Sequence, residues 1–382
     1  MIMKILYLTV PSFFDLEISL IRELTKIVDL KVLMIVSPES MHSSAFSIDK
    51  LDERCDIIPA TEYRGLDKYA NMINLNDWYI ANNPDNSILH GISLAKKIRK
   101  FYNANGFTFL HSTTACKTAT MNLPFYACLK NTLYTLHDPI PHKKQNLFDD
   151  IVRSRMMLRS FKNLLFLSDA LIEPFCKRYG HARENIYFSR LSVYDFLKSY
   201  PQEPNQYGEY IFFFGRIDEY KGVDILIKAF LDSKVSKEGV NLIVAGKGTL
   251  NDIPENLPDK VKILNKYIPN DELAHLIRNC KFVVLPYRTA TQSGCVMSAF
   301  AFNKPILATR VGDLPNVVIE GETGALCEPN SIESLSKAID NFCSEDLSVL
   351  EDKIKKRFSH ESEYSWAAIA KGLVNIYRTI EH

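Results

Sequence analysis

The chain contains 382 residues, enough for two domains of ordinary size. Lysine and arginine number 46 against 45 aspartates and glutamates, and this formal net charge of +1 argues against a nucleic-acid binder held by bulk charge. The 46% hydrophobic and 24% charged content excludes wholesale disorder. Composition therefore predicts an ordinary two-domain globular protein.

Eight cysteines are scattered without a Cys-x-x-Cys pair, so we expect free thiols in a reducing cytosol rather than a zinc ribbon or a disulfide framework. The apolar N-terminal segment stops at Pro11 and has neither a basic region nor a cleavage site, which predicts a first strand and not a signal peptide. No apolar run approaches the roughly 20 residues of a membrane span. The expected location is the cytoplasm, with a place at the inner face of the membrane left open.

In the first half, short apolar runs alternate with segments of helical period. We expect strands at 5–10, 30–36, 107–110, 131–136 and 164–167. Between the first two, leucines and isoleucine recur at helical spacing, at Leu16, Leu20, Leu24 and Ile27. Strands that are apolar on both faces, with helices between them, predict a parallel sheet covered on both sides.

The second half is more regular and predicts a second doubly wound unit. Its expected strands are 210–214, 241–245, 261–264, 282–285 and 305–308, and its expected helices are 223–230, 271–280, 294–302 and 331–342. Residues 199–208 are polar and contain prolines, as is typical of a linker. Two such units facing each other leave a cleft, and ligands bind outside the carboxyl ends of the strands, so we expect the site in the loops that follow strands.

The first chemical motif follows the strand 210–214. Gly215 ends the strand, Arg216 comes next, and Lys221 lies just before the following helix. Two cations at the carboxyl end of a strand suit a diphosphate, because arginine offers planar bidentate contact and lysine a point charge. The alternative is that both are solvated charges flanking a turn.

A Gly-x-Gly follows the next strand, as Gly246-Lys247-Gly248. Two glycines permit positive φ and a close approach of backbone to a ligand. This is not the dinucleotide-binding fingerprint, because the third glycine is missing and Asp252 follows too soon for the ribose carboxylate.

The third motif is a polar turn that opens a helix after the strand 282–285. The turn is Thr291-Gln292-Ser293-Gly294, and the segment ends at Lys304-Pro305. Free N–H groups and the positive dipole end at such a helix start favour a phosphate.

In this order and spacing, the motifs resemble the donor half of glycosyltransferase family 4, over about Tyr210 to Phe342. Gly312-Asp313-Leu314-Pro315 and Gly321-Glu322-Thr323-Gly324 extend the likeness, and Tyr364-Ser365-Trp366-Ala367 with the helix behind it resembles the family's last helix. The resemblance implies the α/β GT-B fold, two Rossmann-like doubly wound domains facing across a cleft. The acceptor-side domain would span 1–200, completed by a helix at 363–382, and the donor domain 207–362.

The family further implies a retaining glycosyltransferase that moves a hexose-type sugar from a nucleotide-diphosphate donor to a glycan or lipid-linked acceptor, in polysaccharide or glycoconjugate biosynthesis, without a metal or other cofactor. Carried over by position, Arg216 and Lys221 would bind the diphosphate and stabilise the leaving group. The remaining donor contacts would come from Gly215, Gly246, Lys247, Tyr267, Ile268, Gln292, Ser293, Gly294, Cys295 and Ser298, with Tyr267-Ile268 packing the nucleobase.

The chain departs from the family at two glutamates, which commonly lie eight positions apart around this turn. Ala290 and Ser298 occupy those places. Gln292 and Ser293 would then supply hydrogen bonds to sugar or phosphate, and Ser298 a shorter contact to ribose. The loss keeps two alternatives open: a catalytically degenerate sugar-nucleotide binding subunit, and a GT-B epimerase acting on a sugar nucleotide.

In the first half, His137-Asp138-Pro139 follows a strand and resembles an element found in a branch of the same family. We expect His137 near the transferring sugar as an orienting donor, with Asp138 fixing the turn. One alternative is a polar turn with a satisfied histidine. Another is a metal held by His137, Asp138, His142 and His111, which the stiffening prolines of the loop disfavour.

Residues 94–101 form a basic amphipathic stretch. Such a stretch is typical of an interfacial helix, but the solvated face of a Rossmann helix is the favoured interpretation. The expected partners are thus a nucleotide sugar and its acceptor, with peripheral membrane contact open and no nucleic acid.

Overall fold

The computed structural model describes residues 3–43, 45–114, 116–137, 156, 158–254, 256–290 and 293–381. The chain divides into two compact units, residues 1–191 with 366–382 and residues 192–365. The boundary falls earlier than the linker predicted at 199–208. The reason is that the Arg278 guanidinium donates 3.0 Å hydrogen bonds to the carbonyls of Tyr200 and Pro201, which ties this segment to the second unit.

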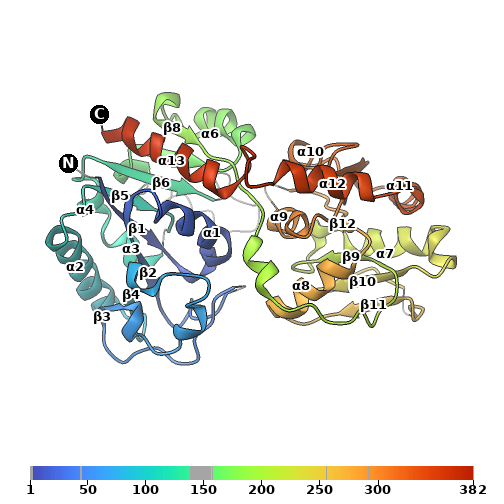
Figure 1. Ribbon diagram of the computed structural model, residues 1–382, viewed down its shortest axis with the longest axis horizontal. Coiled ribbons are helices and arrows are strands. Elements are labelled where there is room, and N and C mark those ends of the chain that lie inside the picture. The colour runs from blue at the N-terminus through green and yellow to red at the C-terminus, as the bar shows by residue number, and fades with distance from the viewer. Residues whose placement is uncertain are drawn as a thin grey trace. The chain divides into compact units, whose positions relative to one another are not determined.

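The first unit is built on an eight-stranded sheet in the order β3-β4-β2-β1-β5-β6-β7-β8 (Figure 1). Its strands are β1 Lys4–Thr9, β2 Asp29–Val36, β3 Asp56–Pro59, β4 Trp78–Asn82, β5 Phe109–Ser112, β6 Thr132–Leu136, β7 Asn163–Phe166 and β8 Ile186–Phe188. Only β3 departs from the predicted parallel arrangement, since it runs antiparallel to β4. As an edge strand it pairs on one side alone, so its direction leaves the parallel ladder intact.

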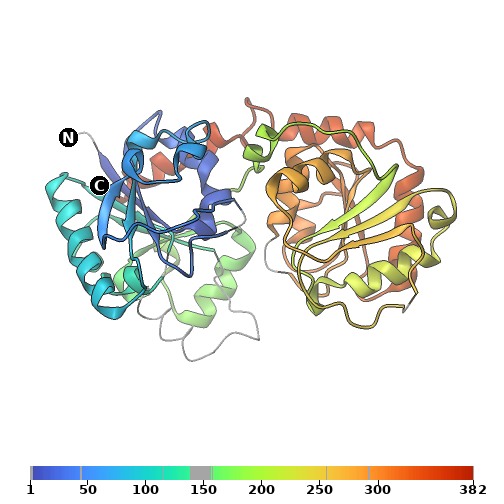
Figure 2. The ribbon, with the colours of Figure 1, turned by 90° about the horizontal axis from the view of Figure 1, so that it is seen from below.

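Helices cover both faces of this sheet (Figure 2). They are α1 Phe14–Leu24, α2 Ile88–Ala104, α3 Lys117–Thr120, α4 Leu123–Tyr126, α6 Ile172–Tyr179 and α13 Trp366–Glu381. The Ser87 hydroxyl caps α2 by accepting a 3.2 Å hydrogen bond from the N–H of His90, and Leu94, Ile98 and Tyr102 then enter the core at helical spacing. On the sheet's other face, α1 packs against α13.

A buried histidine anchors α13 to the sheet. The Nδ1 of His111 on β5 lies 2.7 Å from the hydroxyl of Tyr377 on α13, and its Nε2 lies 2.7 Å from the hydroxyl of Thr135 on β6. All three residues are buried. The C-terminal helix is therefore held in the first unit by a specific polar contact as well as by packing.

Because His111 is buried in this contact, we expect the folded protein to lose stability in acid. Burial lowers the pKa of His111 from 6.5 to about 3, with the charge of His137 acting in the same direction. Between these values the unfolded chain binds a proton that the folded chain does not, so stability is lost as the pH falls from about 6.5 toward 3. A His111→Gln variant should lose stability less steeply, by up to about 1.4 kcal/mol per pH unit. Urea unfolding of both proteins at several pH values checks this, and equal slopes would contradict it.

The second unit contains a six-stranded, wholly parallel sheet in the order β11-β10-β9-β12-β13-β14. Its strands are β9 Tyr210–Phe214, β10 Asn241–Ala245, β11 Val261–Leu264, β12 Val283–Leu285, β13 Ile306–Thr309 and β14 Gly324–Cys327. The five predicted strands are present within a residue or two at each end. Four of them are apolar runs buried on both faces, whereas β11 contains the exposed Lys262 and is buried only at Val261. β14 was missed.

Its helices are α7 Val223–Asp232, α8 Asn270–Asn279, α9 Gly294–Ala301, α10 Leu314–Val317, α11 Ile332–Ser344 and α12 Ser348–Arg357. α7 packs with α11, while right-handed crossovers place α8 and α9 on the opposite face. The chain order runs from β9 toward β11 on one side and from β12 toward β14 on the other. The loops after β9 and β12 therefore diverge at the carboxyl edge, which is where such sheets bind ligands.

Candidate functional site

The loops that follow β9 and β10 are joined to each other by backbone hydrogen bonds. The N–H of Ile217 donates to the carbonyl of Lys247 over 3.1 Å, and the N–H of Thr249 donates back to Ile217 over 3.2 Å. A side chain at Gly246, where φ is 150°, would collide with the Gly215 carbonyl, and one at Gly248 would collide with that of Ile217. From the sequence we expected these two glycines to let the backbone approach a ligand closely. In the structure their close contacts are instead with the carbonyls of the neighbouring loop, which follows β9.

Lys221 is a buried cation in the loop that leads into α7. It is 8% exposed, and its Nζ lies 3.7 Å from the centre of the Tyr287 ring and 5.1 Å from that of Tyr220. Burial lowers the pKa of Lys221, and the Arg216 charge acts in the same direction. Within the described part of the chain neither Lys221 nor the exposed Arg216 forms an ion pair. A dehydrated ammonium without a counter-ion is poised for an anion.

Arg288, directly after β12, fixes the position of this loop. Its guanidinium contacts the carboxylate of Asp224 through two bonds of 2.8 and 2.7 Å and donates to the carbonyl of Glu219 over 2.6 Å. The loop also turns at Gly222, where φ is 65° and a Cβ would meet the carbonyl of Pro286. These contacts preorganise Lys221, and the sequence analysis assigned no role to Arg288 or Asp224.

The start of α9 lies beside the end of β9. The Cys295 thiol donates to the carbonyl of Phe214 over 3.3 Å, which brings the first turn of α9 next to Gly215. Ser293 precedes the helix without capping it, because its hydroxyl lies 3.0 Å from that of Tyr287 instead. The first N–H groups of α9 therefore keep their capacity to bind an anion.

The other predicted donor contacts fall at the same edge of the sheet or outside the described residues. Lys247 is exposed, and Tyr267, 56% exposed, and the half-buried Ile268 follow β11. The Ser298 hydroxyl donates to the carbonyl of Gly294, 3.1 Å away in its own helix. Gln292 lies outside the described residues.

In the first unit, His137 lies directly beyond β6 and stacks on Phe13, with ring centres 3.8 Å apart and planes 19° from parallel. Its Nε2 lies 3.7 Å from Oε1 of Glu17, a carboxylate on α1 that is 2% exposed. Glu17 was not among the residues predicted from the sequence. Its signal was the spacing that it shares with Ile21 and Leu24, which places a carboxylate in the apolar stripe of α1.

The metal alternative has little support from the residues that the structure describes. Both ring nitrogens of His111 are hydrogen-bonded, to Tyr377 and Thr135, so this histidine is not a free ligand. No group of three or more His, Cys, Asp and Glu side chains placed to hold a metal ion is found in the described ranges. Asp138 and His142 lie outside them.

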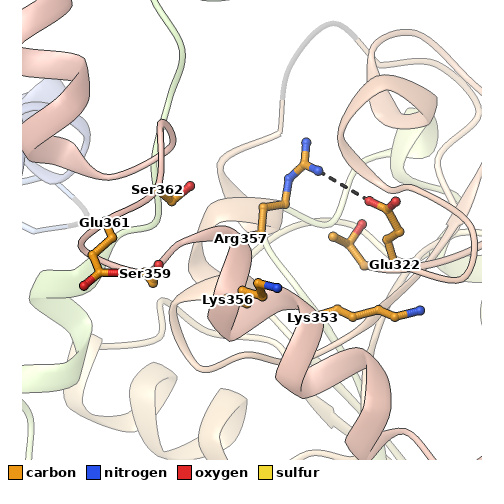
Figure 3. Close-up of a pocket in the computed structure, with 8 residues that line it drawn as sticks. Glu322, Lys353, Lys356, Arg357, Ser359, Glu361 and Ser362 are labelled. Carbon is orange, nitrogen blue, oxygen red and sulfur yellow. Dashed lines mark ion pairs between the residues drawn. The ribbon is translucent and has the colours of Figure 1, made fainter.

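A cavity of about 620 Å³ lies in the second unit, lined by α12, the segment that follows it and the turn before β14 (Figure 3). Lys353, Lys356 and Arg357 of α12 line it, yet Lys353 donates to the Gly321 carbonyl and Arg357 pairs with Glu322 over 3.5 Å. Glu322 precedes β14, so the cavity faces the amino end of that strand. Ligands of such sheets bind at the carboxyl ends, so this cavity is not at the edge where a ligand is expected.

Residues 208–345 match the family model described as glycosyl transferases group 1. An uncharacterized glycosyltransferase of Methanocaldococcus jannaschii, MJ1178, is 27% identical over 326 residues, which cover 80% of this chain and 88% of that protein. The protein is a glycosyltransferase whose region 208–345 matches the group 1 family.

Two further comparisons fit this glycosyltransferase assignment. The D-inositol 3-phosphate glycosyltransferase of Corynebacterium aurimucosum is 27% identical over 179 residues, 43% of this chain but only 42% of that protein. The crystal structure of Anabaena Alr3699/HepE in complex with UDP and glucose covers 99% of this chain and 100% of its own, with a TM-score of 0.68 at 16% identity. That likeness establishes the GT-B fold.

At the first of the two missing glutamates, this glycosyltransferase places Ala290 in a tight backbone contact. A side chain at Gly312, where φ is 54°, would collide with the carbonyl of Ala290. The second place is the buried Ser298. No carboxylate is present at either of these two positions.

Proposed function

We propose that this glycosyltransferase moves a hexose-type sugar, with retention of configuration, from a nucleotide-diphosphate donor to a glycan or lipid-linked acceptor. The observation that carries the donor class is the ammonium of Lys221, buried on Tyr287 without a counter-ion in the described residues. It lies in the loop that Arg216 opens, at the edge where α9 begins. A diphosphate would supply the missing negative charge.

Catalysis would rest on stabilising the departing diphosphate. Lys221 and Arg216 would neutralise its growing charge, and the N–H groups at the start of α9 would bind the remaining oxygens. This arrangement assigns the role of a metal to two side chains, so we propose a metal-independent reaction. With Ala290 and Ser298 in place of the glutamates, an oxocarbenium-like transfer on the face of the leaving group is the route that needs the fewest groups from the protein.

The HepE complex with UDP and glucose supports a donor of this class, and we extend that binding to the present chain. The test is a panel of UDP-, GDP- and ADP-linked sugars, with release of the nucleoside diphosphate measured in the presence and absence of EDTA. Release that EDTA leaves unchanged is expected. Calorimetric binding of a nucleoside diphosphate without release would favour the binding subunit, and conversion of the donor sugar without transfer the epimerase.

We also propose that α2 contacts an anionic membrane surface, where a lipid-linked acceptor would be met. Among the described residues no helix is both long and apolar enough to span a membrane. Ile88, Leu89 and Ile92 are nevertheless 72%, 79% and 43% exposed. Lys96 and Lys100 follow at intervals of four, on the same exposed side. Exposed apolar residues beside lysines are typical of interfacial helices.

This contact predicts binding to vesicles that contain phosphatidylglycerol. A variant with Lys96→Glu and Lys100→Glu should bind at least roughly tenfold more weakly, because each lysine near an anionic surface contributes about 1 kcal/mol. Co-sedimentation measures it, with Lys237→Glu and Lys262→Glu in the second unit as the matched pair. Equal loss in both pairs would show a general charge effect and contradict the role of α2.

A further inference from the structure

A small cavity lies inside the first unit, at the carboxyl edge of its sheet. Its volume is about 20 Å³, room for one water-sized group. Leucines of α1 and of the segments that end β7 and β8 form its apolar walls, with Trp366 of α13. Its polar side comes from Tyr7, Glu17, His111, Thr135, His137, Ser189 and Arg190. The strands β1 and β5, where the chain order of this sheet reverses, both contribute to it.

Two polar atoms in this lining lack a partner. The Glu17 carboxylate accepts a 2.5 Å hydrogen bond from Thr9 at Oε2 and interacts with the Tyr7 hydroxyl, but its Oε1 is buried and has no donor in hydrogen-bonding geometry among the described residues. The Nε2 of His137 is likewise buried and has no hydrogen-bond partner among the described residues. The two atoms are 3.7 Å apart, too far for a direct hydrogen bond. A buried polar atom left unpaired is unfavourable, so the pair calls for a third group.

The chemistry of the pair selects the kind of group. A carboxylate oxygen only accepts, so the group must donate to Glu17. In the tautomer that carries its proton on Nε2, His137 donates to the same group. A hydroxyl does both through one oxygen, whereas an ammonium cannot accept and a phosphate would be repelled by the Glu17 charge. His111 cannot serve instead of His137, because both of its nitrogens are already bonded.

We propose that Glu17 and His137 together bind one hydroxyl group of a sugar substrate, with a water in that place when no sugar is bound. The proposal rests on the proposed function, and it adds Glu17 as a binding residue in the first unit. Stacking on Phe13 holds the imidazole in position, and the hydrogen bond from Thr9 holds the carboxylate. The hydroxyl belongs to the donor sugar or to the acceptor, which the experiment distinguishes.

The test replaces the carboxylate by its amide, with Glu17→Gln. If the amide oxygen keeps the bond from Thr9, the NH₂ group faces His137 and the substrate hydroxyl loses its acceptor. We expect kcat/KM to fall roughly 10- to 100-fold while Tm stays within about 2 °C of the unaltered protein. Glu23→Gln is the matched control, because Glu23 is on the same helix but pairs with Lys26 over 2.7 Å. It should leave both quantities unchanged.

Monodeoxy analogues of the donor sugar and of the acceptor identify the hydroxyl. With the analogue that lacks it, the unaltered enzyme and Glu17→Gln should differ by less than about threefold, because there is nothing left for Glu17 to bind. If no analogue abolishes the difference, or if Tm falls in step with activity, Glu17 is structural and the proposal is overturned.

A crystal structure tests the proposal without any activity. An ordered oxygen within hydrogen-bond distance of both Glu17 Oε1 and His137 Nε2 is expected, and an empty space between them would overturn the proposal. Glu17→Gln should also leave the affinity for UDP or GDP unchanged, because those contacts lie in the second unit. Failure of the donor panel with this oxygen present would count against the proposed function and not against the Glu17–His137 pair.

Discussion

Replacing Lys221 by methionine is expected to lower kcat/KM for the sugar donor by roughly 100- to 1000-fold, the effect of removing one preorganised group that stabilises a leaving-group charge. The side chain is almost isosteric and can keep its packing on Tyr287. Because the ammonium is buried without an ion pair in the described residues, its removal should leave Tm equal or slightly higher. Donor kinetics and thermal unfolding of the same preparation measure the two effects.

The matched control is Lys228→Met on α7, where the lysine pairs with Asp252 over 2.6 Å at the surface. It should change neither activity nor Tm appreciably. Arg216→Ala should act in the same direction as Lys221→Met, with weaker binding of the nucleoside diphosphate in calorimetry. Unchanged diphosphate affinity in both variants would place the donor phosphates elsewhere.

Gly246→Ala is expected to destabilise the second unit by roughly 2–4 kcal/mol. The residue has φ at 150°, and an added Cβ would collide with the carbonyl of Gly215, so the two joined loops would have to separate. The melting temperature should fall by roughly 5–15 °C for a unit of this size. Donor affinity should fall with it, because the displaced loop is the one that leads to Arg216 and Lys221.

Gly239→Ala separates the two parts of this effect. Gly239 also has positive φ, at 90°, but an added Cβ would meet nothing within 4 Å. The Gly239→Ala variant should therefore lose only the free energy of unfolding that is due to backbone strain, about 1–2 kcal/mol, because no collision is added. Comparable unfolding curves for the two variants would mean that the contact between the loops contributes little.

Local pattern was a good guide to the second unit. Strands such as Tyr210–Phe214 are continuous apolar runs with every residue buried, and no helical period competes with that signal. β14, Gly324–Cys327, was missed because it is short, begins with glycine and is half-buried. β3, β4 and β8 were missed as well. Asp56 and Pro59 in β3 hide a strand that only its partner β4 stabilises, and β8 is only three residues long.

The candidate site was predicted unevenly. Spacing indicated Lys221 and the start of α9, because a cation or a polar turn just beyond an apolar run is visible in one dimension. The contact between Lys221 and the Tyr287 ring could not be predicted, because Tyr287 is far along the chain and looks in the sequence like the continuation of a strand. Glu17 lies 120 positions before His137, and nothing local shows that the two face one another.

The sequence by itself determined two α/β units, the positions of most strands along the chain, and the placing of charged and glycine-rich loops at strand ends, because these follow from short-range period and composition. Tertiary structure alone decided which of those groups are dehydrated and which are paired. It buried Lys221, bonded Arg288 to Asp224 and placed Glu17 beside His137. Burial and pairing depend on residues distant in the chain, and so does the strength of every charge at the site.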